Sequence, residues 1–426
     1  MNPITRLGEL GVHLPDVLIP RSSIDLERWA VIACDQFTSD PDYWAAVETF
    51  VGDAPSTLRI VLPEIYLEED SDAPTAYDDI KATMQQYLDS DVFRKIERSA
   101  VYVRRHLRGG GTRRGIVLAL DLERYDYHRG SDSLVRASEE TIPSRLPARI
   151  AIREGAAIET PHVLVLYDDP DARITNDLDT ATAAAPPLYD TSLMMEGGRV
   201  EGFRIGADDD AVNGLAEAFG ELSSREKYGF LFATGDGNHS LAAAKDVWES
   251  HKRDGASMDD PRRYCLVELV NLHDSGLPMH PIHRIAGTKE GTLLDELLHR
   301  ADARFHGMSA SRLVDHMERD RLSGNEIGFL GPVQSGILSL PEEAALPVGL
   351  VDEAITAVDT PSVDYTHGLN DTIRAAEKSG SVAIFLPEID RSTLFPTIAR
   401  KGALPRKAFS LGEARDKRYY LECRKL

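Results

Sequence analysis

The sequence predicts an α/β or α+β protein, with mixed sheets and flanking helices. Short apolar runs of strand length alternate, though not strictly, with segments that carry a helical pattern. The 426 residues exceed what one small core accommodates, so two or three subdomains are expected. A hydrophobic content of 42% with 28% charged residues is ordinary for a soluble globular protein and allows a sizeable core.

The first hundred residues contain two candidate strands and two candidate helices. The apolar run Trp29–Cys34 predicts a buried strand, and residues 58–62 predict another. Between them, Ser39-Asp-Pro-Asp42 supplies an N-cap and a proline in the first turn of a helix. The pattern over residues 74–98 predicts a second, longer helix.

A hairpin and a series of single elements follow. Strands are expected at 100–105 and 115–120, and the glycine-rich segment 108–114 predicts a flexible tip between them. Later apolar and helical patterns predict strands at 163–167, 264–272, 336–340 and 381–386, and helices at 209–222, 240–252 and 372–378.

Loops expected near 170–200 and 300–325 suggest three regions. These are an N-terminal α/β region over 1–200, a middle region over 201–320, and a C-terminal α/β region over 321–426 that ends in a basic tail.

The charge and the cysteines narrow the classes of function. A formal net charge of −22 argues against a nucleic-acid or anionic-membrane surface, because long-range repulsion opposes both. Cys34, Cys265 and Cys423 lie far apart without a CxxC pair, which disfavours a disulfide scaffold or a cysteine-zinc site. Cys34 is expected to be buried filler rather than a nucleophile. Neither a signal-like start nor an apolar run of membrane-spanning length occurs, so we expect a cytoplasmic protein.

The stretch Thr234–Ala244, TGDGNHSLAAA, is the best single candidate for a site of chemistry. It joins an apolar strand to an alanine-rich helix, and its glycines let backbone N–H groups approach an anion at the helix N-terminus. Asp236 suits a magnesium ion that bridges phosphates, and His239 suits donation to a phosphoryl oxygen. The alternative is a plain turn in which Asp236 and Asn238 supply only turn and capping chemistry.

An arginine cluster precedes this turn in the sequence. No acidic residue lies between Arg145 and Arg153, which is unusual in so acidic a chain. Arg149 and Arg153 are four residues apart and would share one face of a helix. Such a pair suits phosphate or carboxylate recognition, and the alternative is a solvated face paired to nearby acids.

Histidines and a basic tail supply further candidates. His273, His280 and His283 match no common zinc spacing, and Pro281 argues against an HxxH helix, so a substrate-facing loop is favoured. The segment VDYTHG, with His367, is another candidate. The last 26 residues hold eight Lys or Arg against three acids, which would either close an anionic-ligand pocket or neutralise an acidic neighbour.

Six ordered motifs resemble a known family over nearly the whole chain. They are ACDQFTSDPDYW (33–44), RASEETIPSRLPARIAIREGAAIETPHVLVLYDD (136–169), GDGNHSLAAAK (235–245), ELVNLHDSGLPMHPIHR (268–284), DYTHG (364–368) and LPRKAFSLGEARDKRYYLE (404–422). Together they resemble the bacterial and archaeal family labelled domain of unknown function 1015. Its central motif, [AG]-D-G-[HN]-H, is similar to the D-G-H-H-R turn of free serine kinases with the ParB/sulfiredoxin-like fold, which implies such a subdomain over 201–320.

In those kinases a glutamate acts as base while the turn holds phosphates and the magnesium site. The resemblance implies phosphoryl transfer from a nucleotide to the hydroxyl of free serine. Asp236 and His239 match the aspartate and the second histidine of the turn, whereas Asn238 replaces the first histidine. Ser240 replaces the arginine and removes a phosphate clamp. The missing charge would then come from one of four arginines: Arg149, Arg153, Arg284 or Arg406.

The remaining family elements complete the expected site. Glu139 resembles the glutamate of the family's H-E-x-T element, with Thr141 at its threonine, and is the expected base. Sulfiredoxin chemistry is disfavoured because that activity needs a cysteine where Asn238 stands, and a ParB-type DNA-binding role sits badly with the net charge.

The leading hypothesis is a small-molecule kinase that uses Mg²⁺ and ATP or ADP. Its expected catalytic residues are Glu139, Asp236 and His239, with Asp236 also the metal partner. The expected phosphate- and substrate-binding residues are Gly235, Gly237, Asn238, Ser240, Arg136, Thr141, Arg145, Arg149, Arg153, His283, Arg284, His367, Arg406 and Lys407. Its partners would be a small-molecule substrate and the nucleotide, without nucleic acid or membrane, and a homodimer is left open.

Two other classes remain as alternatives. One is a regulatory protein that binds a nucleotide or anionic metabolite without turnover. The other is a metal-assisted hydrolase that uses Asp236, His239, His273 and Asp274.

Overall fold

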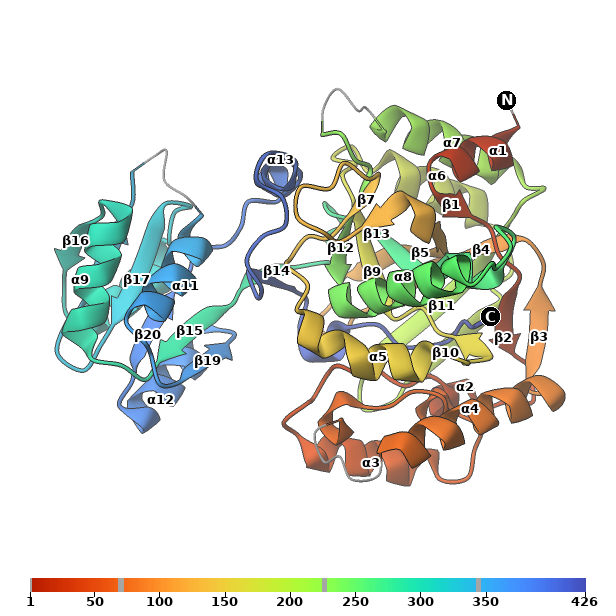
Figure 1. Cartoon of the computed structure of the whole chain (residues 1–426), viewed down its shortest axis with the longest axis horizontal. Coiled ribbons are helices and arrows are strands. Elements are labelled where there is room, and N and C mark those ends of the chain that lie inside the picture. Colours follow the sequence, from red (N-terminus) through yellow and green to blue (C-terminus); the bar gives the residue numbers. More distant parts are fainter. Residues whose placement is uncertain (1, 68–72, 224–227, 342–345) are drawn as a thin grey trace. The chain divides into compact units, whose positions relative to one another are not determined.

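The computed structural model describes residues 2–67, 73–223, 228–341 and 346–426, with the backbone alone for 73–75 (Figure 1). The chain forms two compact units, unit 1 (Met1–Leu277 with Gly412–Leu426) and unit 2 (Pro278–Leu411). The structure therefore divides the chain at other positions than the three expected regions, since residue 200 falls inside unit 1 and residue 320 inside unit 2.

Unit 1 is built on one large mixed sheet. Its strands, in spatial order, are β10 (Tyr189–Leu193), β11 (Gly198–Gly206), β4 (Ser99–His106), β5 (Thr112–Asp121), β13 (Tyr264–Asn271), β9 (Val163–Tyr167), β12 (Phe232–Asp236), β7 (Val135–Arg136) and β6 (Tyr125–Asp126), and β1 (Val12–His13) also pairs with β5. Neighbouring strands run antiparallel from β10 to β13, whereas β13 with β9, β12 with β7, and β7 with β6 are parallel.

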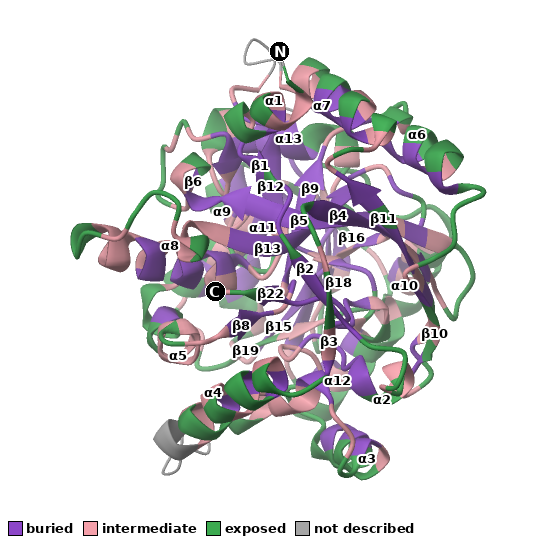
Figure 2. Cartoon of the chain, turned by 90° about the vertical axis from the view of Figure 1, so that its right-hand side faces the viewer, coloured by how far each residue is buried: buried purple, intermediate pink, exposed green. Residues whose placement is uncertain are grey.

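Alternation along the strands gives the sheet a core on each face. In β4, Ala100 and Tyr102 enter one apolar cluster, while Val101 and Val103 enter the other. Helices α1 (Pro3–Glu9), α6 (Arg173–Thr182), α7 (Asp210–Leu222) and α8 (Asn238–Arg253) contribute side chains to the first cluster. The second cluster takes its helical side chains from α2 (Leu26–Trp29), α3 (Pro41–Val51) and α4 (Ala73–Asp89). Figure 2 shows the strands buried between these layers.

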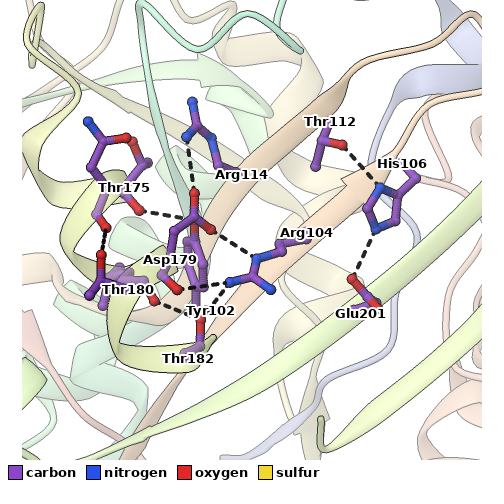
Figure 3. A network of polar contacts seen from close by, with 12 residues as sticks. Tyr102, Arg104, His106, Thr112, Arg114, Thr175, Asp179, Thr180, Thr182 and Glu201 are labelled. Atoms are coloured by element: carbon purple, nitrogen blue, oxygen red, sulfur yellow. Dashed lines mark hydrogen bonds and ion pairs between the residues drawn. The ribbon is translucent and has the colours of Figure 1, made fainter. Parts of the chain in front are cut away.

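A polar network ties α6 to the sheet (Figure 3). The Asp179 carboxylate accepts hydrogen bonds from the Tyr102 hydroxyl at 2.9 Å, from Arg104 Nε at 2.9 Å and from Arg114 Nη1 at 3.2 Å. Arg104 also donates to the Thr182 hydroxyl at 2.7 Å. These three hydrogen bonds compensate the Asp179 carboxylate for its loss of hydration. The network therefore holds α6 against β4 and β5.

The C-terminal segment 412–426 returns to unit 1. Its strand β22 (Arg424–Lys425) pairs with β8 (Ile158–Glu159), and Cys423 and Tyr419 form isolated bridges with Leu18 and Ile32. Leu18 itself belongs to β2 (Val17–Pro20), which pairs with β3 (Phe93–Ile96). The expected basic tail is therefore part of the packed body of unit 1 from residue 412 onward.

Several expected elements differ in the structure, each for a local reason. Residues 29–34 are buried as predicted but are not a strand, because α2 ends at Trp29 and only the bridge at Ile32 follows. Residues 58–62 are not a strand either, because Ser56 caps the short 3₁₀ helix Thr57–Arg59. The helix expected to reach residue 98 ends at Asp89, and strand β3 follows within the predicted range.

The two expected loops contain regular elements. The first, near 170–200, holds α6 and β10, and polar residues masked the helical pattern of α6. The second, near 300–325, holds β16 (Arg304–Gly307) and α10 (Ala310–Arg319), of which α10 buries only Leu313 and so lacks a strong apolar stripe.

The remaining predictions of elements are confirmed within a few residues, and so is the mixed α/β class. Strand β9 has the predicted bounds, because five consecutive apolar residues suit a strand covered on both faces.

Unit 2 is an antiparallel sheet with helices. Its strands, in order, are β16, β18 (Ser335–Ser339), β17 (Glu326–Leu330), β20 (Val382–Phe385), β15 (His283–Ala286) and β19 (Val363–Thr366). A small ribbon pairs β14 (Met279–Pro281) with β21 (Phe409–Leu411). The helices of this unit are α9 (Glu290–Ala301), α10, α11 (Pro347–Ala357), α12 (Leu369–Ser379) and α13 (Arg391–Lys401). Across the described parts of both units, the helices are too short or too polar to cross a bilayer.

Phe219 tests the packing of the first core. It is fully buried and meets Tyr167 and Phe232 edge-to-face, with ring centroids 5.6 and 5.3 Å apart. We expect Phe219→Ala to lower the free energy of unfolding by about 3–5 kcal/mol, measured by denaturant titration, because it leaves a cavity. Met258→Ala, at an exposed position in the same unit, should change it by less than about 0.5 kcal/mol. Equal losses in both variants would contradict this account of the core.

Candidate functional site

The turn from β12 to α8 depends on Gly237. This residue is the N-cap of α8 and has φ 79°, a left-handed conformation that favours glycine. A Cβ atom there would also come within 3.2 Å of Val163 Cα. No side chain caps the helix within the described residues, so its first N–H groups remain available to a ligand.

The segment 138–142 is fastened to this turn at both ends. The Ser138 N–H donates to Thr234 Oγ1 at 2.9 Å, and the Ile142 N–H donates to His239 Nε2 at 3.0 Å. The Thr234 hydroxyl in turn donates to Asn238 Oδ1, so Asn238 supports the turn from inside. These bonds bring Glu139 and Thr141, which are distant in sequence, beside the N-terminus of α8.

His239 is a neutral imidazole with a defined tautomer. Burial, reinforced by the positive charges of Arg149 and Arg145, lowers its pKa to about 4. Because Nε2 accepts the hydrogen bond from Ile142, the ring proton resides on Nδ1. His239 therefore offers one N–H donor and no positive charge at neutral pH.

Asp236 is held by a lysine of the C-terminal segment. Its Oδ2 lies 2.9 Å from Lys417 Nζ, and its Oδ1 accepts the Gly237 N–H at 3.0 Å. Burial opposes ionisation of this carboxyl, but Lys417, His162 and the Gly237 N–H together hold its pKa below the usual range. The sequence singled out the basic tail but not Lys417, and only the excess of positive charge in the tail pointed to it.

The residues around Asp236 do not fit a resident magnesium ion. Both carboxylate oxygens already have protein donors, and the closest cation is Lys417. Among the described residues, no three His, Cys, Asp or Glu side chains are grouped to hold a metal ion. The role expected for Asp236 as a protein ligand of a metal is thus not supported by its contacts.

A cavity of about 140 Å³ lies beside the first turns of α8. Ser240 and Ala243 of α8, Arg149 of α5 (Leu146–Arg153) and His162 line it, together with apolar side chains such as Leu62. Arg149 forms an ion pair with Glu64, which lines the same cavity. The structure therefore brings three of the expected ligand-binding residues, Arg149, Arg153 and Ser240, to one cavity.

Cys34 lines this cavity without being a reactive thiol. Burial, assisted by the nearby Asp35 carboxylate, raises the pKa of Cys34 to about 12. Its thiol is therefore protonated at neutral pH, in keeping with the expected role as filler.

The other expected arginines differ in their surroundings. Arg153 pairs with the buried Glu159 at 2.7 Å, and Arg136 donates to the carbonyls of Ser133 and Gly229. Arg145 is exposed at the start of α5. The expected residues His283, Arg284, His367, Arg406 and Lys407 belong to unit 2. There Arg284 is fully buried and its Nε lies 2.9 Å from Asp352 Oδ1, so it supports unit 2 internally.

The hydrolase constellation is not assembled. Asp236 pairs in register with Leu164 near the start of β9, whereas Asn271 pairs with Tyr167 at its end. His273 and Asp274, which follow Asn271, thus lie beyond the opposite ends of these strands from Asp236. His273 Nε2 instead contacts Asp168 at 2.7 Å, and Arg114 Nε donates to Asp274 at 3.0 Å.

The sequence of the chain matches one known protein family. Residues 18–365 match the family described as protein of unknown function, DUF1015. The chain belongs to this family. No curated protein matches the chain.

Solved structures with some likeness share little sequence. A conserved hypothetical protein from Pyrococcus furiosus has 10% identity and a TM-score of 0.35, over 71% of this chain and 93% of that one. A free serine kinase in complex with AMP has 9% identity and a TM-score of 0.38, over 71% and 90%. SbnI with C-terminal truncation, from Staphylococcus aureus, has 10% identity and a TM-score of 0.36, over 70% and 82%. TM-scores this low say nothing about the chemistry of this chain.

The ion pair of Lys417 with Asp236 should be needed for stability. The Lys417 side chain is 10% exposed, so Lys417→Met leaves a partly buried carboxylate without its cation. We expect the free energy of unfolding to fall by about 1–3 kcal/mol, less than for a fully buried pair, because 32% of the Asp236 side chain is exposed. Denaturant titration would measure this loss. Adding Asp236→Asn should restore part of it, whereas Lys425→Met, at an exposed lysine of the same segment, should have little effect.

His239 should make stability depend on pH. Its folded pKa of about 4 lies below the ordinary 6.5, so between these values the unfolded chain binds more protons and stability rises with pH. We expect His239→Gln to lose less stability than the parent chain when the pH falls from 7 to 5, measured by denaturant titration. The exposed control His306→Gln should keep the parent's dependence. An identical dependence in His239→Gln and the parent would refute the assignment.

Proposed function

We propose that the chain is a nucleotide-dependent phosphotransferase that acts on the hydroxyl of a small metabolite, with free serine as the first acceptor to test. ATP or ADP is the donor and enters as its Mg²⁺ complex. The observation that supports this most is the pair of hydrogen bonds that fasten segment 138–142 to the β12–α8 turn. They support a role for Glu139, because the segment that contains it is held beside a helix N-terminus that suits a phosphate.

The transferring phosphate would rest on the first turn of α8. The positive end of the helix and its unused N–H groups favour an anion, and Gly237 lets the ligand approach the backbone. His239 adds a neutral donor at Nδ1, because Nε2 is already bound to Ile142. Such fixed donors stabilise the equatorial oxygens as charge spreads over them in transfer.

Two side chains take the place of the arginine that Ser240 does not provide. Lys417 lies at Asp236, and Arg149 lines the cavity with Ser240. In the structure these cations are paired with Asp236 and Glu64. A bound nucleotide would compete with Asp236 and Glu64 for these two cations.

Glu139 would act as the general base. Its carboxylate takes the proton of the acceptor hydroxyl while that oxygen attacks the terminal phosphorus of the nucleotide. The bond from phosphorus to the bridging oxygen breaks, and ADP leaves when ATP is the donor, or AMP when ADP is. The products are the phosphate monoester of the acceptor and protonated Glu139.

A binding protein without turnover is the second candidate. It is favoured by the same two ion pairs, Lys417 with Asp236 and Arg149 with Glu64, because a ligand that breaks them could change the conformation of a regulatory site. It requires nucleotide-dependent thermal stabilisation with no product.

The test is phosphoryl transfer by the purified chain with ATP or ADP, Mg²⁺ and a panel of amino acids and hydroxy metabolites. Glu139→Gln should reduce turnover about 10²–10⁴-fold, the usual contribution of a general base, without weakening nucleotide binding. The matched control is Glu140→Gln, since Glu140 is the exposed next residue and should keep the parent rate. If no combination of nucleotide and acceptor gives a product, the kinase hypothesis is wrong. If Glu139→Gln and Glu140→Gln have equal rates, Glu139 is not the general base. Binding without product favours the second candidate.

A further inference from the structure

Unit 2 contains a cavity of about 270 Å³ of its own, which suits a small ligand. It is lined by two sequence motifs that the proposed transfer reaction leaves unused. Pro281 and His283 come from LPMHPIHR, and Gly368 comes from DYTHG. Its walls combine the apolar side chains of Met317, Leu322, Leu369, Phe385 and Leu386 with the polar side chains of His280, His283, Arg321 and Glu388.

His283 presents one unused donor to this cavity. The residue is only 7% exposed, and its Nδ1 accepts the Leu386 N–H at 3.2 Å. The ring proton therefore resides on Nε2, which has no hydrogen-bond partner among the described residues. Burial, with the nearby His367 and Arg284, lowers the pKa of His283 to about 4. The side chain is thus a neutral donor.

The N-terminus of α12 lines the same cavity. Gly368 is its N-cap with φ 76°, no side chain caps it within the described residues, and both Gly368 and Leu369 lie in the wall. The first N–H groups of an eleven-residue helix are therefore directed to the same region as His283. Asp371, in the first turn, is largely exposed and paired with Arg374, which limits its repulsion of an anion.

The charge of the walls limits the charge of the ligand. Arg321 and Glu388 line the cavity and pair with each other at 2.9 Å; both side chains are at least half exposed, and the pair adds no net charge. No lining residue of this cavity is a buried Lys or Arg. A helix N-terminus and one neutral histidine suit a single negative charge better than a phosphate dianion, which calls for more cationic partners.

We propose that this cavity of unit 2 binds a small monocarboxylate with an apolar body, its carboxylate held by His283 Nε2–H and the N-terminus of α12. The apolar body lies against Phe385, Leu386 and Met317, where it loses its contact with water. The polar donors then fix orientation while the apolar wall provides most of the affinity.

The test uses the full chain with phenylacetate and 4-methylvalerate, each compared with its uncharged amide, by titration calorimetry. We expect both acids to bind one to a chain and the amides to bind at least about tenfold more weakly, since the charge contributes roughly 1.4 kcal/mol or more. Histidine side-chain ¹⁵N NMR of the unmodified chain should show His283 as the Nε2–H tautomer, with its signal moving on addition of acid.

Two variants complete the test. His283→Phe should weaken acid binding at least about tenfold, whereas His306→Gln, at an exposed histidine of the same unit, should leave it unchanged. No binding of either acid, equal binding of acid and amide, or an unmoved His283 signal would each overturn the proposal. Glu139→Gln should bind the acids like the parent chain, so failure of the phosphotransferase proposal and failure of this one are separable.

Discussion

The return of the C-terminal segment into unit 1 is the constraint on which the candidate site depends. Lys417 supplies the cation for Asp236, and the Tyr420 hydroxyl accepts the Cys34 N–H at 2.9 Å. The Ala33 N–H donates to the Arg418 carbonyl at 2.7 Å. The last residues of the chain therefore fix both the turn before α8 and the extended segment after α2. Unit 1 cannot complete its site until the chain has passed through all of unit 2 and come back.

Buried charge explains why this segment is so basic. Glu159 is buried in unit 1, where burial alone would favour its neutral form. Arg424 and Arg153 hold its pKa below the usual range, and Arg424 Nε donates to it at 2.6 Å. A buried carboxylate with two guanidinium partners avoids the cost of an unpaired charge. Of the two alternatives for the tail, neutralising acidic neighbours is the one that these contacts support. Arg153 and Arg149 both line the cavity, and each is paired with an acid, Glu159 and Glu64 respectively.

The sequence predicted those parts of the fold that are decided locally. Strand β9 and helix α8 have an apolar run and a helical pattern strong enough to specify them alone. The sequence predicts a strand over residues 29–34 because an apolar run indicates burial. These residues are indeed buried, but their pairing depends on Tyr419, almost 400 residues away. The same distance hides the pairing of Asp236 with Lys417, which are 181 residues apart. Glycines in the sequence locate a turn, but the residues that contact the turn depend on how distant parts of the chain fold together.

Ser240 illustrates how a site can keep its electrostatics while a motif changes. An arginine at this position would place a cation one turn into α8, and the chain has a hydroxyl there instead. Lys417 and Arg149 approach the same turn from two other elements, each already paired with an acid. A cation delivered by a separate segment can be released from its acid when a ligand enters, whereas an arginine fixed on α8 has less freedom to exchange partners. In the proposed function, Lys417 and Arg149 would carry the charge that an arginine at position 240 would supply, so nucleotide binding would depend on how the C-terminal segment packs.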